Sequence, residues 1–162
     1  MNEISVHPGS EENPGFLLWQ VSTLWSKSTT IALKPLRLTH PQFVILATMD
    51  WLKGEGVSQE EIGRRIVLDP KTTSHLLRSL QVKGLIELPQ NTDEKSTCPL
   101  LTTAGTEMLA KALPLVKSAD TAFFSSINLK DSKMVAALQS LARVNFSKND
   151  EEPCSLSEDD EE

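Results

Sequence analysis

Five residues near the middle of the chain could donate hydrogen bonds from one side of a helix. At 100° per residue, Lys71, His75 and Arg78 form the centre of one face, and small hydroxyl side chains flank it. Short and basic donors of this kind suit base edges and phosphates in the major groove of DNA. The five candidate residues are Lys71, Thr72, Ser74, His75 and Arg78.

The charge of this segment favours the same interpretation. Residues 70–85 contain no Asp or Glu, although the whole chain has a formal charge of -6. A face that is merely solvated usually mixes both signs of charge. The alternative is a solvated face that lacks acids by chance.

Local signals predict a helix around these donors. Asp69 suits the N-cap, Pro70 suits the first helical position and Gly84 suits the end. The start of such a helix would add free N–H groups for a phosphate. The opposite side carries an inward-packing stripe of Thr73, Leu76, Leu77 and Leu80.

A short helix is predicted just before the donor helix. Ser58 is followed three residues later by Glu61, which is the pattern of a capping box. Ile62 and Ile66 lie one helical turn apart and supply its apolar side. The two helices are separated by a short turn.

A hairpin is predicted after the donor helix. The apolar runs 85–88 and 98–101 are typical of strands, and the polar stretch 89–97 connects them. Lys95 lies beside Asp93 at the tip, where it could contact a phosphate or the minor groove. An ordinary polar turn is the alternative for this segment.

Helical segments at about 14–34 and 104–147 flank this central region. Their apolar residues recur at helical spacing, and Pro35 ends or interrupts the first of them. The expected fold is mainly α with a small β-hairpin wing (α+β). The central part, about 38–103, has the element order of a winged helix-turn-helix.

The acidic excess is concentrated at one end of the chain. Eight of the 22 acids lie in residues 150–162, so 16 bases and 14 acids remain elsewhere, a net charge of +2. We expect a disordered acidic tail at 149–162 and a flexible arm at 1–13. The tail either competes with phosphates for the basic face or simply aids solubility.

The composition argues against several other classes of protein. We find no signal peptide and no apolar run long enough to span a bilayer, so a cytoplasmic location is expected. The two cysteines are far apart and the three histidines are scattered, so no metal site is predicted. Nucleophile, phosphate-loop and paired-acid motifs are missing, and we expect neither an enzyme nor a cofactor.

At this point the sequence resembles the MarR family of regulators. The resemblance runs from about Pro14 to Phe146 and is most specific in "VSQEEIGRRIVLDPKTTSHLLRSLQVKGLIE" and "DEKSTCPLLTTAG". The family wing usually carries Asp-x-Arg, followed at a fixed offset by Leu-Thr-x-x-Gly. Asp93 and the motif ending at Gly105 keep that offset, but Lys95 replaces the arginine. Lysine cannot make the planar bidentate contacts of arginine.

The resemblance implies a MarR-like domain at 14–148 that contacts double-stranded DNA through the five donors and through Asp93 and Lys95. It also implies a homodimer formed by the terminal helices, binding a pseudo-palindrome. The implied function is a sequence-specific transcriptional regulator, specifically a repressor. The alternative is a winged-helix module that binds another protein and little or no DNA.

The resemblance further implies release from DNA by a small aromatic effector. Five side chains could line a cleft between the terminal helices and the DNA-binding part. They are Trp19, Trp25, Phe43, Met49 and Trp51. A plain role in the core or the dimer interface is the alternative for these residues. Redox sensing by Cys98 would need a depressed thiol pKa and exposure.

Overall fold

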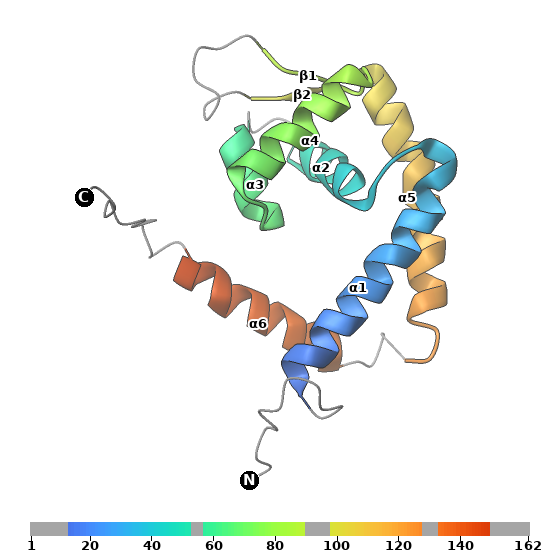
Figure 1. Cartoon of the computed structure of the whole chain (residues 1–162), viewed down its shortest axis with the longest axis vertical. Helices are drawn as coiled ribbons and strands as arrows, with labels where there is room; N and C mark the ends of the chain where they lie inside the picture. The colour runs from blue at the N-terminus through green and yellow to red at the C-terminus, as the bar shows by residue number, and fades with distance from the viewer. Residues whose placement is uncertain (1–12, 53–56, 90–97, 128–132, 150–162) are drawn as a thin grey trace, which may run out of the picture. The chain divides into compact units, whose positions relative to one another are not determined.

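The computed structural model describes residues 13–52, 57–89, 98–127 and 133–149. These residues fall into two units that divide at Phe123–Phe124, and each is described by itself. The predicted class, mainly α with a small antiparallel sheet, is confirmed (Figure 1). The elements are α1 (Pro14–Leu33), η1 (Lys34–Leu36), α2 (His40–Trp51), α3 (Gln59–Ile66), α4 (Pro70–Val82), β1 (Ile86–Glu87), β2 (Leu100–Leu101), α5 (Thr103–Phe123) and α6 (Lys133–Asn149).

Short polar side chains begin the helices of the first unit. Thr39 caps α2, Ser58 caps α3 and Asp69 caps α4, each accepting a backbone N–H three residues on. Asn13 does the same for α1, and Thr102 accepts the N–H of Gly105 at the start of α5. These caps satisfy donors that a helix start leaves unpaired. The helix starts were therefore predictable from local sequence.

One apolar core holds the first unit together. Side chains from α2, α3, α4, β1 and α5 enter it, and Leu33 brings in the end of α1. The α1 helix packs along α5 (Figure 1). Leu77 and Leu80 of α4 are completely buried in this core, so the inner side of α4 is fixed and its outer side faces away from the core.

The two strands are shorter than the predicted four-residue runs. Ile86 pairs with Leu101 and Glu87 with Leu100 in an antiparallel register. The N–H of Leu85 bonds to Leu80 O and closes the end of α4, so only the oxygen of Leu85 pairs across the sheet, where it accepts the N–H of Thr102. With Gly84 N–H on Gln81 O and a φ of 70° at Gly84, this is a Schellman motif. The helix end therefore determines where the strand begins.

The second unit contributes α6 to the described residues. Four apolar residues recur at helical spacing along α6. Met134 is half-buried, whereas Leu138, Leu141 and Val144 are exposed. Within α6, Asn145 Nδ2 donates to Leu141 O over 2.8 Å. Among the described residues, this apolar side of α6 is therefore largely uncovered.

Two kinds of feature are missing from the described ranges. Within them, no helix is long and apolar enough to cross a membrane. The same ranges hold no group of three or more His, Cys, Asp or Glu side chains that could bind a metal ion.

Candidate nucleic-acid interface

The turn between α3 and α4 is tight and depends on a glycine. Val67 adopts a left-handed conformation with φ of 57°, and Leu68 N–H donates to Gly63 O over 3.0 Å. At the start of α4, Thr73 Oγ1 donates to Asp69 O over 2.9 Å. A Cβ on Gly63 would lie 2.8 Å from Thr73 Oγ1, so α3 and α4 approach closely at this point. The predicted helix-turn-helix is thereby formed.

The start of α4 is occupied by its own cap. Asp69 Oδ1 accepts the N–H of Thr72 over 2.9 Å. Hydrogen bonds from the Thr72 side chain and backbone lower the pKa of the Asp69 carboxyl. Pro70, the first residue of α4, has no N–H. The cap therefore takes the N–H of Thr72, and binding of a phosphate at the start of α4 stays a prediction.

The outer side of α4 carries the predicted donors. Lys71, Thr72, His75 and Arg78 are exposed, and Ser74 is half-buried. On the opposite side, Thr73, Leu77 and Leu80 are no more than 1% exposed, and Leu76 packs against the core. The predicted division of α4 into an inward stripe and an outward polar face is confirmed.

The wing is described only at its base. β1 and β2 form the two-stranded sheet, and Thr102 Oγ1 donates to Gly84 O over 2.8 Å beside it. Asp93 and Lys95, predicted at the tip, lie outside the described residues. Their proposed contact with DNA stays a prediction.

Two arginines on α3 add positive charge that the sequence argument missed. Arg64 and Arg65 both donate to the carboxylate of Glu61, with Nε–Oε distances of 2.9 Å and 2.7 Å. These hydrogen bonds, from Arg65 first and then Arg64, lower the pKa of Glu61. The spacing i, i+3 and i, i+4 was the available signal. The two guanidinium groups and the one carboxylate together carry a net charge of only +1.

Gln42 was also missed, although it connects α2 to α4. The pattern Thr39-x-x-Gln42 is a capping box, and the structure contains both of its hydrogen bonds. The Gln42 amide additionally donates to Ser79 Oγ over 2.9 Å. Ser79 lies at the edge of the outward polar face of α4 and also bonds to α2.

The five effector candidates are not brought together. Phe43 and Met49 are buried members of the core. Trp19 is 63% exposed on α1, and Trp51 is 75% exposed with the Arg65 guanidinium 5.7 Å from its ring centroid. Trp25 is half-buried. The described residues therefore offer no single cleft lined by all five side chains.

Trp25 belongs instead to a polar cluster where α1, α2 and α5 meet. Its Nε1 donates to Asp120 Oδ1 over 2.7 Å, and its ring meets that of His40 edge-on at 4.6 Å. His40 Nδ1 lies 3.1 Å from Ser26 Oγ. Burial lowers the pKa of His40, and the charge of Asp120 partly opposes this effect. The cluster joins the terminal helices to the first helix of the DNA-binding part.

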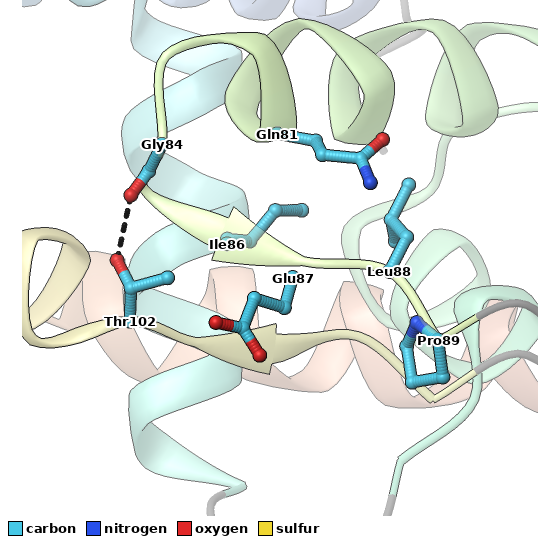
Figure 2. Close-up of a pocket in the computed structure, with 7 residues that line it drawn as sticks. All are labelled: Gln81, Gly84, Ile86, Glu87, Leu88, Pro89 and Thr102. Carbon is cyan, nitrogen blue, oxygen red and sulfur yellow. Dashed lines mark hydrogen bonds between the residues drawn. The ribbon is translucent and has the colours of Figure 1, made fainter.

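A pocket of about 590 Å³ opens between the end of α4 and the base of the wing. Figure 2 shows the Gln81 side chain extending from α4 toward Leu88, beyond Ile86 of β1. None of the five effector candidates lines it. The lining residues are Gln81, Gly84, Ile86, Glu87, Leu88, Pro89 and Thr102.

Known sequences resemble the chain across both the central region and its flanks. The model of the MarR family matches residues 38–97. A Bacillus subtilis (strain 168) protein, the uncharacterized HTH-type transcriptional regulator YdcH, is 35% identical over 138 residues, covering 83% of this chain and 93% of that protein. The HTH-type transcriptional repressor Rv2887 of Mycobacterium tuberculosis (strain ATCC 25618 / H37Rv) is 32% identical over 107 residues, or 65% of this chain and 76% of that protein.

Solved structures share the fold. A DNA complex of S. aureus MepR has a TM-score of 0.70 at 19% identity, covering 85% of this chain and 99% of that chain. Rv2887 has a TM-score of 0.63 in its DNA complex (80% of this chain, 96% of that chain) and 0.59 in its complex with salicylic acid (81% and 97%), both at 24% identity. At these identities the structures establish the winged-helix fold alone. Together with the matched family model and the extent of the similarity to YdcH, they show that the chain belongs to the MarR family of helix-turn-helix transcriptional regulators.

Proposed function

We propose that the protein is a sequence-specific DNA-binding repressor whose α4 is the recognition helix. The observation that carries the proposal is the outward face of α4, where Lys71, His75 and Arg78 are exposed and no acid occurs between residues 70 and 85. The core fixes the opposite side of the helix, so this face enters a major groove as a rigid unit. The repressor name of the relative Rv2887 supports the sign of regulation.

The wing completes the proposed contact. Asp93 and Lys95 follow β1 in the chain and precede β2, so they belong to the connection between the two strands. In this role Lys95 contacts a phosphate or the minor groove. DNA complexes of MepR and of Rv2887 support binding through this fold.

A homodimer is part of the proposal. Six large apolar side chains of α1 are exposed, and exposed apolar residues grouped on one element can mark a surface that binds another protein chain. A two-fold dimer formed through the terminal helices would bind half-sites one helical turn, about 34 Å, apart. The exposed apolar residues of α1 are Leu17, Leu18, Trp19, Val21, Leu24 and Ile31.

An effector would act where terminal helices meet the DNA-binding part. The salicylic acid complex of Rv2887 supports a small aromatic acid as the effector class. Of the candidate residues, Trp25 is placed at that junction, through its contacts with His40 and Asp120. A regulator of this kind works in the cytoplasm and has no catalytic role.

Selection of bound sequences from random duplex DNA tests the proposal. The purified protein should enrich a pseudo-palindrome, and its affinity should fall steeply with salt because phosphate contacts release counterions. Failure to bind any duplex in a salt-dependent manner would overturn the proposal and favour the protein-binding alternative.

A further inference from the structure

A buried glutamine of α2 holds the last turn of α4. Gln42 is only 4% exposed. Its Oε1 accepts from Thr39 N–H over 3.2 Å and from Lys83 Nζ over 2.8 Å, and its Nε2 donates to Ser79 Oγ over 2.9 Å. A buried amide is costly unless it is hydrogen-bonded, so the site is specified by its partners.

These partners fix the orientation of the amide. The backbone N–H of Thr39 and the ammonium of Lys83 can only donate, so both must face the amide oxygen. The amide nitrogen is consequently directed at Ser79, whose hydroxyl accepts. A flipped amide would lose the hydrogen bonds from Thr39 and Lys83, because its nitrogen would then face two donors.

Lys83 extends the connection to the segment before α2. Its Nζ also donates to Arg37 O over 2.7 Å. Arg37 has a φ of 53° and ends η1, the short helix between α1 and α2. Gln42 and Lys83 thereby attach the end of α4 both to the capping box of α2 and to the end of the α1–η1 segment.

Ser79 and Lys83 lie at one edge of the outward face of α4. On an ideal helix Ser79 is 40° from His75, and Lys83 is a further 40° away. Residues one turn apart on the same edge give two points of attachment, which oppose rotation of the helix about its axis. Such a rotation would turn His75 and Arg78 away from the positions from which they contact bases.

We propose that Gln42, through Ser79 and Lys83, positions the recognition helix so that its outward face meets the bases in one register. The inference rests on the proposed function, since it assigns Gln42 to the reading of sequence by α4. Gln42 itself contacts no DNA in this role and is a positioning residue. Loss of its amide leaves α4 anchored by its apolar stripe but free to rotate slightly.

The test compares two substitutions at this position. Gln42→Met preserves length and removes every side-chain hydrogen bond. Gln42→Glu keeps an oxygen that accepts from both Thr39 and Lys83, and the Ser79 hydroxyl can rotate to donate to the second oxygen. Affinities for the selected pseudo-palindrome and for an unrelated duplex of equal length are measured at a temperature where circular dichroism shows every variant folded.

Thr29→Val is the matched control. Thr29 is fully buried, and its Oγ1 donates to Trp25 O within α1 over 3.1 Å. This substitution removes a buried polar group of the same unit without touching α4. It should leave both affinities unchanged once the protein is folded.

We expect Gln42→Met to lose roughly 5- to 150-fold in affinity for the selected duplex, the usual range of coupling between sites. Affinity for the unrelated duplex should stay within about twofold, because phosphate contacts tolerate small rotations. Gln42→Glu should recover most of the loss. A merely structural role would lower both affinities equally, through the folded fraction.

Two results would overturn the inference. One is a Gln42→Met protein with wild-type discrimination between the duplexes, and the other is a Gln42→Glu protein as impaired as Gln42→Met. In both cases the wild type still binds its selected duplex, so the proposed function survives. A wild-type protein that binds no duplex removes both proposals together.

Discussion

The hydroxyl of Thr73 in α4 lies against the α-carbon side of Gly63 in α3. A Cβ on Gly63 would be 2.8 Å from Thr73 Oγ1 and 3.3 Å from the backbone oxygen of Leu68. The helices can cross this closely because Gly63 has no side chain. The position of α4 relative to the rest of the DNA-binding part therefore depends on one small residue.

Gly63→Ala should lower the free energy of unfolding by about 1–3 kcal/mol, as overpacking of a buried contact does. Denaturant unfolding measures this cost. In a Thr73→Ala background the same substitution should cost less, because the opposing hydroxyl and methyl groups are gone. Equal costs in the two backgrounds would show that the crowding lies elsewhere.

Gly105→Ala should be more destabilising than Gly63→Ala. A Cβ on Gly105 would lie 2.0 Å from the backbone oxygen of Leu85, which also accepts the N–H of Thr102. A backbone carbonyl in a hydrogen-bonded turn cannot rotate away as a hydroxyl can. The comparison is made by denaturant unfolding of both variants, and a smaller cost for Gly105→Ala would contradict the expected order.

Removing one cation from the outward face of α4 should weaken operator binding. Arg78→Ala or Lys71→Ala should cost about 1–3 kcal/mol of binding free energy where the side chain contacts a base. Titration of the selected duplex at several salt concentrations separates the two kinds of contact. A phosphate contact should instead reduce the salt slope by about one.

Lys111→Ala is the control for these two variants. Lys111 is an exposed cation of the same unit but lies on α5. Its removal changes the net charge equally without altering the proposed face. If Lys111→Ala weakened binding as much as Arg78→Ala and Lys71→Ala, general electrostatic attraction rather than the α4 face would explain the affinity.

Local signals made α4 and its two sides predictable from the sequence. Asp69 and Pro70 mark the start, Gly84 marks the end, and the apolar spacing assigns Leu77 and Leu80 to the core. Each signal acts within about one helical turn. Such signals determine the ends and the buried side of the helix in any fold that buries one side of it.

Contacts between elements could not be predicted in the same way. The bond from Gln42 to Ser79 joins residues 37 positions apart, and only the packing of α2 on α4 brings them together. Phe43 and Met49 were candidates for a cleft because aromatic and sulfur side chains suit ligands and cores equally. Their burial in the core depends on which side of α2 faces α4 and α5.

The cap of α4 should make stability sensitive to acid. Hydrogen bonds from Thr72 lower the pKa of the Asp69 carboxyl below its ordinary value of 3.8. The unfolded chain therefore binds this proton first, and the stabilisation is present above that value and lost as the pH falls through the lower folded-state pKa. Melting temperatures between about pH 5 and pH 2.5 should fall more steeply for wild type than for Asp69→Asn.

Asp69→Asn serves as the matched variant because its oxygen can still accept the N–H of Thr72 without titrating. Other carboxylates titrate in both proteins and cancel in the difference between the curves. Parallel melting curves for the two proteins across this pH range would contradict the assignment.

His40 should produce a second loss of stability nearer neutral pH. Burial lowers the pKa of His40 below 6.5, so the unfolded state takes up the proton first. The contribution of neutral His40 is complete above pH 6.5 and declines as the pH falls from that value through the folded-state pKa. His40→Gln should remove this part of the pH dependence of the melting temperature.

The charge of Asp120 provides a second test of the assignment to His40. Its attraction for the protonated imidazole opposes the effect of burial, so removing the charge should lower the pKa of His40 further. Asp120→Asn does this while leaving an oxygen to accept from Trp25 Nε1. The loss of melting temperature on acidification should therefore be larger in Asp120→Asn than in wild type, and it should shrink again when His40→Gln is added. Two results would show that His40 is not the group that titrates. One is a smaller loss of melting temperature in Asp120→Asn than in wild type, and the other is an undiminished loss in the double variant. Only an imidazole that is partly buried and near this carboxylate should respond to both substitutions in the expected directions.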